Sequence, residues 1–511
     1  MSKDAMTTDG VGATPDPQRP APAPQAGREP GLPDNPWPAL WALVLGFFMI
    51  LVDSTIVSIA TPALMEHFGA DINQVLWVTS AYLLAYAVPL LITGRLGDRY
   101  GPKRLYLVGL TVFTLSSLWC GLTGSIGGLI AARVVQGLGA AMMTPQTMTV
   151  ITRTFPPERR GSAMALWGAT AGVATLVGPL LGGVLIDALD WRWIFFVNIP
   201  VGLLALVLAW RFVPVLQTHA RSLDGVGIAL SAVGLFCGVF AIQEGEQFGW
   251  GTIVGPISVP LLLIVAGLLL AAFVVWQARM RREPLVPLSL FRDRNFSLAN
   301  IGILCVGFTV VAFIFPFTFY AQTVRGLSPT QAALLLAPSA VVSIILARPA
   351  GKLIDRVHPR ILAGIGLLAW SLSLFLLGHL MRPGTPTWQI LGTAVLLGAS
   401  SSLVWGPLST SASRNLPPHL AGAGSGVYNT TRQMGSVLGS AGIAALMQAR
   451  IAVHLPGGSA APHAAPGATL PPQIADALAA ALREAILLPA AVLLIAWLAA
   501  LFFERPRHLR R

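Results

Sequence analysis

The stretch Gly94-Arg-Leu-Gly-Asp-Arg-Tyr-Gly-Pro-Lys-Arg104 decides the fold, because a second stretch, Gly351-Lys-Leu-Ile-Asp-Arg-Val-His-Pro359, repeats its pattern. Glycine, leucine, aspartate, arginine and proline match at identical offsets, 257 residues apart. The alternative is a chance similarity of two short basic turns. Each stretch directly follows a long apolar run, however, so we expect the chain to contain two related halves.

The composition is that of a membrane protein. Of the 511 residues, 54% are apolar and only 11% are charged, whereas an ordinary soluble domain has about 25% charged residues. This balance excludes a soluble multidomain enzyme, a disordered protein and a disulfide scaffold. The three cysteines lie in apolar runs, where we expect them to pack without forming disulfides. The chain is thus predicted to be an all-α polytopic membrane protein, with about 20 apolar residues in each crossing.

Fourteen apolar runs of spanning length follow the N-terminal tail, among them residues 75–94, 162–187 and 330–349. The number of basic residues alternates from one connection between runs to the next. The tails and the even-numbered connections together hold 26 lysine and arginine residues, and the odd-numbered connections hold 5. This asymmetry follows the positive-inside rule and predicts that both termini are cytoplasmic. It also accounts for the net charge of +12 without a nucleic-acid partner. Arginine supplies 30 of the 33 cations, which is typical of a GC-rich bacterium, so we expect the bacterial inner membrane.

The repeat and the spans together predict the domain organisation. The first six and the last six spans form two related six-helix bundles, and the seventh and eighth are inserted between them. Parallel repeats of this kind are a transporter architecture, with the substrate site between the halves near the middle of the membrane. The predicted segments are a disordered cytoplasmic tail at 1–36, an N-terminal bundle at 37–213, two linking helices with a cytoplasmic loop at 214–296, a C-terminal bundle at 297–504 and a cytoplasmic tail at 505–511.

Asp53 is the strongest single candidate for a functional residue. It lies near the middle of the first span and is the only carboxylate well inside any predicted span. A central aspartate costs about 2.5–3.5 kcal/mol on insertion scales. An acid that takes a proton from one side and releases it to the other suits a proton-coupled carrier. The alternative is an acid that only holds helices together through hydrogen bonds.

Two arginines also lie inside predicted spans. Arg133, in the fourth span, cannot lose its proton, so we expect it to pair with an acid or with backbone carbonyls and to tune the proton affinity of that acid. Whether it contacts Asp53 is left open by the sequence. Arg432 is the corresponding residue of the second bundle, and a side chain that extends to the cytoplasmic surface is the alternative there.

The fifth span and the repeated loop supply further candidates. Pro179 kinks the fifth span, and the small residues of this span allow a neighbouring helix to approach closely. That motif consists of Gly178, Pro179, Gly182 and Gly183. The cytoplasmic loop is either a turn with basic anchors or a gate in which Asp98 pairs with a helix N-terminus of the other bundle. Its candidates are Gly94, Asp98, Arg99, Gly101, Lys103 and Arg104, with Asp355 and Arg356 in the second bundle.

Several classes of chemistry lack a motif. No phosphate-binding loop occurs, because Gly351-Lys352 is followed by leucine, so we expect no ATP hydrolysis. There is no zinc-spaced set of cysteine and histidine. We therefore expect neither an enzyme nor a bound cofactor, with the proton gradient as the energy source.

In combination, these stretches resemble the major facilitator superfamily and, within it, the 14-span drug:proton antiporters of the EmrB/QacA type. Gly94–Arg104 resembles the signature loop after span 2, and Leu129–Ala140 resembles the span-4 motif with Arg133 at the motif arginine. Gly172–Leu185 resembles the antiporter motif of span 5. Further similar stretches are Asp53–Pro62, Trp191–Gly202 and Gly424–Gly435.

The resemblance implies roles for these residues. Asp53 and Arg133 would take part in proton coupling, Asp98 would help to lock the cytoplasmic side, and the span-5 motif would mark export. The expected function is proton-coupled antiport of lipophilic or cationic drugs or antibiotics by alternating access. The alternatives are an exporter of one metabolite or self-made antibiotic and, more remotely, a non-transporting membrane sensor. The partners are the drug, protons and the lipid bilayer, and the fold needs only a monomer.

Overall fold

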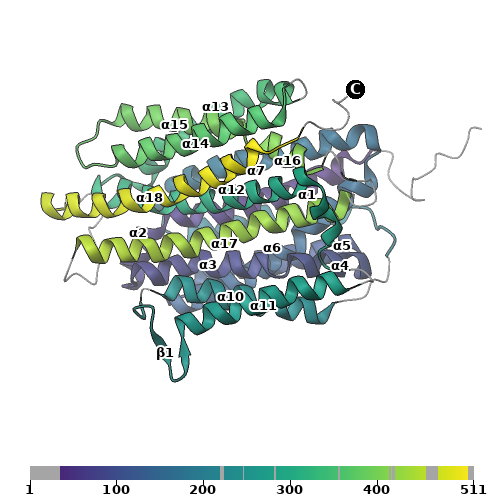
Figure 1. Ribbon diagram of the computed structural model, residues 1–511, viewed down its shortest axis with the longest axis horizontal. Coiled ribbons are helices and arrows are strands. Elements are labelled where there is room, and N and C mark those ends of the chain that lie inside the picture. The colour runs from purple at the N-terminus through teal and green to yellow at the C-terminus, as the bar shows by residue number, and fades with distance from the viewer. Residues whose placement is uncertain are drawn as a thin grey trace, which may run out of the picture.

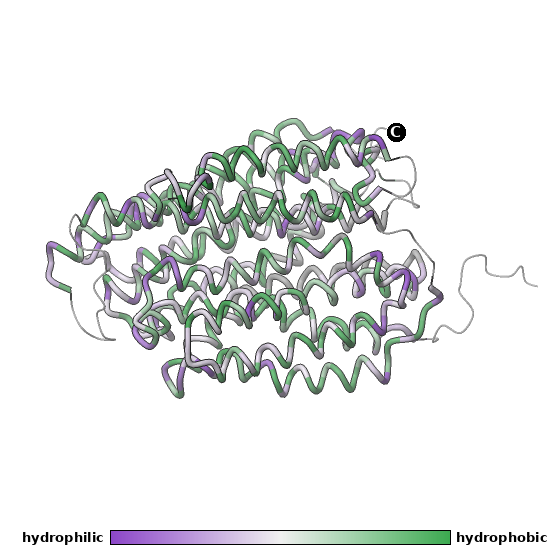
Figure 2. The backbone as a smooth tube through the Cα atoms, turned by 90° about the horizontal axis from the view of Figure 1, so that it is seen from below, coloured by the Kyte–Doolittle hydropathy of each residue, from purple (hydrophilic) through white to green (hydrophobic). Residues whose placement is uncertain are grey.

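The computed structural model describes residues 35–218, 224–245, 247–280, 284–354, 357–413, 416, 421–455 and 470–504. Nearly all of the elements are helices that run alongside one another (Figure 1). Hydrophobic residues dominate the middle of the helices, and hydrophilic ones gather towards their ends (Figure 2). The chain is therefore an all-α polytopic membrane protein, as its composition predicts.

The first half contains nine helices in the described residues. Asp71 begins α3 with a capping box, in which its side chain accepts from the backbone N–H of Gln74, and Ser125 caps α6. The helices are α1 (Trp37–Ile59), α2 (Thr61–Phe68), α3 (Ile72–Ala87), α4 (Leu90–Tyr100), α5 (Pro102–Leu122), α6 (Ile126–Thr154), α7 (Pro157–Ala188), α8 (Trp193–Phe196) and α9 (Asn198–Phe212).

The inserted segment contains α10 (Gly225–Glu244), the strands β1 (Thr252–Val254) and β2 (Ile257–Ser258), and α11 (Val259–Arg279). The two strands pair as a short antiparallel hairpin that projects from one end of the molecule (Figure 1). Asp224 caps α10 and Ser258 caps α11. A 3₁₀ helix, η1 (Leu288–Arg292), leads into the second half.

The second half of the chain is also helical in its described residues. Pro316 lies inside α12, and the chain continues directly into a short π-helix, η2 (Tyr320–Val324). The remaining elements are α12 (Arg294–Phe319), α13 (Pro329–Ile354), α14 (Pro359–Leu380), α15 (Thr387–Ser402), α16 (Trp405–Ser413), α17 (Ala421–His454) and α18 (Pro472–Leu501).

In the described residues, twelve helices are long and apolar enough to cross a membrane, and the bent pair α3–α4 would be a thirteenth. The bend of 50° lies next to Pro89, which lacks a backbone N–H and interrupts the helix inside the predicted run 75–94. The predicted run 162–187 lies in α7, whose part Val177–Ala188 is a shorter apolar helix. The count of fourteen spans therefore stays a prediction, as do the boundaries of the two bundles.

Two helix pairs form most of the contact between the halves, namely α3 with α17 and α7 with α13. The predicted repeat would relate the second span to the tenth and the fifth to the thirteenth, and it would exchange these two pairs. Such an exchange is what a two-fold relation between repeats produces. The inserted helix α10 packs against both α3 and α17, and α11 packs against α10 at the edge of the molecule (Figure 1).

Candidate functional site

Asp53 is fully buried in α1 and accepts hydrogen bonds from three side chains. Arg133 Nη1, on α6, lies 2.5 Å from Oδ2. Gln136 Nε2, one turn further along α6, donates to Oδ1 at 3.0 Å. Asn198 Nδ2, the first residue of α9, donates to the same oxygen at 2.9 Å. The carboxylate therefore joins α1, α6 and α9, and all of its contacts are compatible with the ionised form.

Arg133 is also fully buried, and its other hydrogen bonds go to α3 and to its own helix. Its Nε donates to the Val78 carbonyl at 3.1 Å, and Nη1 also donates to Gln136 Oε1 at 2.6 Å. The guanidinium lies 4.0 Å from the centroid of the Tyr82 ring, which is a favourable cation–π position. Within the described residues its Nη2 has no hydrogen-bond partner. The cation is thus paired on one side and retains donor capacity on the other.

Asn198 and Ser117 are site residues that sequence reasoning missed. Asn198 Nδ2 bonds to Ser117 Oγ of α5 at 3.0 Å as well as to Asp53, and Ser117 Oγ donates to the Phe195 carbonyl at 2.9 Å. Both side chains are buried. The available signal was an asparagine at the start of the apolar sixth span, inside the stretch Trp191–Gly202 that resembles the family.

The glycines of the fifth-span motif lie between α1 and the second half of the chain. A Cβ added to Gly182 would come within 2.7 Å of the Ile56 side chain on α1. One added to Gly183 would come within 2.7 Å of the Thr330 backbone on α13. Gly178 packs against α1 at Val52, next to Asp53, and Pro179 is inside α7. An added Cβ would meet backbone atoms at Gly183 and the side chains of Thr55 and Ile56 at Gly178 and Gly182, so α7 fits closely between α1 and α13.

The first repeated loop is held to helices of its own half. Asp98 forms an ion pair with Arg153 of α6 at 3.2 Å, and Arg153 Nη1 also donates to the Gln217 carbonyl at 2.8 Å. Lys103 Nζ donates to the Trp210 carbonyl of α9 at 2.6 Å. Both side chains of the Asp98 pair are mostly buried. The arrangement ties the loop to α6 and α9.

The other loop candidates have simpler surroundings. Gly101 has φ +97°, which favours glycine, and it separates α4 from α5. Arg99 lies 5.6 Å from the centroid of the Tyr100 ring, Arg104 is exposed, and Gly94 faces Pro145 of α6. Asp355 and Arg356 of the second loop lie outside the described residues.

Arg432 lies on α17, partly buried, at the level where this helix meets α3. The hydroxyls of Ser80 on α3 and Ser440 on α17 are 2.6 Å apart and fix the register of the two helices. Arg432 lies within electrostatic range of Tyr86 and Tyr428. The structure therefore does not bring Arg432 into the Asp53 network, but places it across the interface between the halves.

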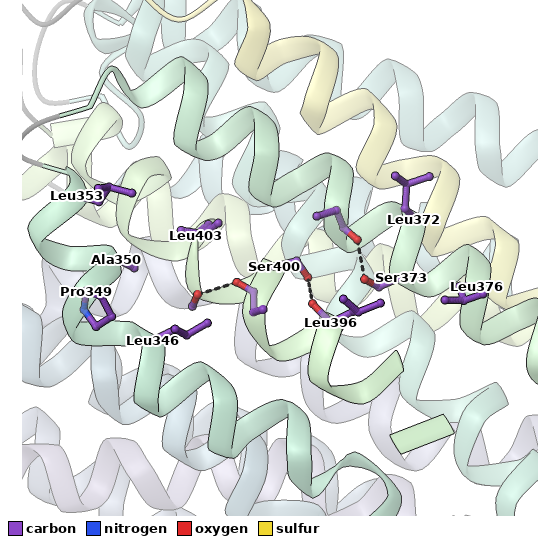
Figure 3. Close-up of a pocket in the computed structure, with 13 residues that line it drawn as sticks. Leu346, Pro349, Ala350, Leu353, Leu372, Ser373, Leu376, Leu396, Ser400 and Leu403 are labelled. Carbon is purple, nitrogen blue, oxygen red and sulfur yellow. Dashed lines mark hydrogen bonds between the residues drawn. The ribbon is translucent and has the colours of Figure 1, made fainter. Parts of the chain in front are cut away.

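One pocket belongs to the second half alone (Figure 3). It has a volume of about 610 Å³ and lies between α13, α14 and α15. Its walls are almost entirely apolar, and Leu353, Leu372 and Leu396 among its lining are exposed at the surface. The Ser373 and Ser400 hydroxyls in it bond to carbonyls of their own helices. This groove is therefore separate from the Asp53 network and opens on the outer, apolar surface of the helices.

The sequence profile of the Major Facilitator Superfamily matches residues 43–440. The chain is 51% identical to the "Uncharacterized MFS-type transporter Rv1250" of Mycobacterium tuberculosis, over 92% of this chain and 81% of that one. It is 34% identical to the tetracenomycin C resistance and export protein of Streptomyces glaucescens, over 82% and 78%. It is 30% identical to the multidrug export protein EmrB of Haemophilus influenzae, over 81% of each.

The fold agrees with these similarities. A crystal structure of a bacterial homolog of the human lysosomal transporter Spinster superposes with a TM-score of 0.62, at 18% identity, over 92% of this chain and 98% of that one. A chain with this family and fold is a transporter and not an enzyme. The protein belongs to the major facilitator superfamily, in its group of drug-efflux transporters related to EmrB.

Proposed function

We propose that this protein is a secondary exporter that exchanges protons for lipophilic or cationic drugs or antibiotics across the bacterial inner membrane. The observation that carries the proposal is the buried pair of Asp53 and Arg133. A carboxylate held by one cation and two neutral amides can exist ionised in the middle of the membrane, since its charge is balanced and its oxygens accept hydrogen bonds. Protonation of Asp53 would remove the ion pair and leave Arg133 to its carbonyl contacts.

The packing around α1 supports a route from this proton to the interface between the halves. Asp53 lies on α1, and the glycines of α7 pack against α1 on one side and against α13 on the other. Loss of the ion pair between α1 and α6 could move α1, and a movement of α1 would change how α7 packs against α13. Discrete rearrangement of closely packed helices is how small changes at a site become large movements of domains.

Alternating access needs contacts between the halves that can open. Asp187 Oδ2 of α7 accepts from Ser328 Oγ at 2.8 Å and from the backbone N–H of Thr330 at 3.0 Å. Gln322 Nε2 donates to the Ile59 carbonyl at 3.0 Å. With cytoplasmic termini, as the distribution of basic residues predicts, these contacts close the extracellular side.

The substrate class rests on the named relatives and on the membrane location. One relative is named for multidrug export and another for export of tetracenomycin C. The similarity to the tetracenomycin C exporter supports an alternative, namely a narrow exporter of one metabolite or self-made antibiotic. Both readings share the same coupling site, so they differ in the panel of compounds that the protein moves.

The test uses inverted membrane vesicles that hold a respiration-driven pH gradient. A panel of lipophilic cations and uncharged antibiotics is added, and release of protons on addition of compound is recorded for wild type, Asp53→Asn and Asp476→Asn. Asp476 is an exposed carboxylate of α18 and serves as the matched control. We expect release in wild type and Asp476→Asn only. Normal release in folded Asp53→Asn would refute the role of Asp53, and a response to one compound alone would favour the narrow exporter.

A further inference from the structure

The inserted helix α10 ends in a buried carboxylate that the coupling site does not use. Glu244 is 7% exposed and is the last residue of α10. Its Oε1 accepts from Asn73 Nδ2 at 2.9 Å and from the indole N–H of Trp77, both on α3. Both donors are neutral, and within the described part of the chain Glu244 has no ion-pair partner. A carboxylate at the C-terminal end of a helix also meets the negative end of the helix dipole.

The surroundings of Glu244 are rich in oxygen acceptors. Asn73 Nδ2 donates also to Gln247 Oε1 at 3.1 Å, while Asn73 Oδ1, in the same amide group, is buried and has no partner among the described residues. The neighbouring Gln243 is fully buried, and neither atom of its amide has a described partner. Buried polar atoms without partners are rare in native structures and call for an explanation, such as an absent ligand.

Aromatic rings lie beside Glu244 and its neighbours. The Trp77 and Phe240 ring centroids are 6.0 Å apart, and Phe240 and Phe236 stack at 5.9 Å along α10. Trp77 and Phe240 are partly exposed and Gln247 is exposed, so the cluster reaches the surface. A carboxylate without a counter-ion, an unused acceptor and aromatic faces are together the recognition chemistry of an organic cation.

We propose that Glu244, Asn73 and Trp77 form a binding site for the ammonium or iminium group of an amphiphilic organic cation. The cation would neutralise Glu244, its N–H groups would bond to Asn73 Oδ1, and its apolar body would lie against the rings. In the described residues no group of three or more histidine, cysteine, aspartate or glutamate side chains could hold a metal ion, which makes a metal a poorer occupant. The proposal names a substrate class for the proposed exporter and therefore rests on that function.

The position of the site suggests its place in the transport cycle. Trp77 is next to Val78 on α3, whose carbonyl accepts from Arg133. The helix α3 therefore contacts both sites: the Val78 carbonyl accepts from Arg133, and the Trp77 indole donates to Glu244. With the proposed orientation, Glu244 lies towards the extracellular side and would hold a cation on its way out. The inserted pair α10–α11 would then add a substrate contact to the two bundles.

The test measures binding to the full-length purified protein in detergent, without a proton gradient. The probes are ethidium, a cation with amino N–H donors, and its uncharged diaminophenylphenanthridine parent, each followed by fluorescence anisotropy. We expect Glu244→Gln to weaken ethidium binding at least about tenfold, because it removes one partner of a desolvated charge pair, with little effect on the parent. Glu66→Gln, which removes an exposed charge from α2, should change neither affinity.

A second variant separates charge recognition from a purely structural role. Trp77→Phe removes the indole donor to Glu244 but keeps an aromatic face and the carboxylate, so ethidium affinity should stay within about threefold of wild type. The proposal is overturned if Glu244→Gln binds ethidium as tightly as wild type does, or if it loses affinity equally for both probes. It is also overturned if Trp77→Phe loses tenfold in ethidium affinity, or if wild type does not prefer ethidium over its uncharged parent. Asp53→Asn should still bind ethidium, because the assay does not need proton coupling. The binding result therefore tests the Glu244 site separately from the proposed antiport.

Discussion

Arg133 Nη1 and Asp53 Oδ2 lie 2.5 Å apart in side chains that are both fully buried, although 80 residues separate them in the chain. The pair joins α1 to α6, and the neutral amides of Gln136 and Asn198 complete the coordination of the carboxylate. A buried pair of this kind costs desolvation energy and is stable only with good geometry and further hydrogen bonds. This network and the contacts of α7 with α13 lead to four predictions beyond the tests described above.

Loss of one partner of the pair should destabilise the protein more than loss of both. Arg133→Leu leaves Asp53 as an uncompensated buried charge, which costs about 3–5 kcal/mol. The double variant Asp53→Leu/Arg133→Leu removes both charges and should recover a large part of that loss. Thermal melting of the purified variants in detergent measures this order. A double variant less stable than Arg133→Leu would show that the pair does not act as one electrostatic unit.

Replacement of Asn198 should weaken proton-coupled transport. Asn198→Leu removes a donor to Asp53 Oδ1 and to Ser117 Oγ, so a buried carboxylate and a buried hydroxyl each lose a hydrogen bond. We expect slower proton release on drug addition than in wild type, at equal amounts of folded protein. Proton release in inverted vesicles measures the loss. Asn300→Leu on α12, a buried asparagine outside the network, serves as the control.

A side chain at Gly183 should weaken the contact between the halves. The added Cβ of Gly183→Ala would meet the backbone of Thr330, which cannot move without shifting α13. We expect slower disulfide cross-linking between Asp187→Cys and Ser328→Cys in this background, because α7 and α13 separate. Gly392→Ala on α15 meets open space and should leave the cross-linking rate unchanged. Equal rates in all backgrounds would mean that close packing at Gly183 is not needed.

Asp187 should hold the same end of the molecule closed. Its carboxylate accepts from the backbone N–H of Thr330 at the start of α13, where the helix dipole favours a negative charge. Asp187→Ala removes that interaction, so a cysteine at Thr330 should react faster with a membrane-impermeant maleimide. Asp190→Ala is the matched control, because Asp190 bonds to Arg192 and Trp191 within its own loop. The prediction is wrong if both variants react at the same rate.

Parts of the site could be predicted because they are costly in any membrane helix. A carboxylate and an arginine in the middle of apolar runs stand out in the sequence, whatever they contact. Asn198 and Ser117 did not stand out, because neutral polar residues are common in such helices and gain their meaning only from the neighbour they reach. Glu244 does not stand out in the sequence, because it lies at the end of an apolar run, and its burial against α3 depends on how the inserted helix packs.

The sequence by itself determined the membrane class, the helical character of the chain, the repeated loop motif and the resemblance to the drug-efflux transporters. These follow from hydropathy and residue spacing, which act locally along the chain and need no knowledge of packing. Only the tertiary structure decided that Arg133 meets Asp53, that the α7 glycines separate α1 from α13, and that Arg432 faces α3 instead of the coupling site. The reason is physical: a helix fixes the order of its side chains, but its rotation and its neighbours are set by the packing of the other helices.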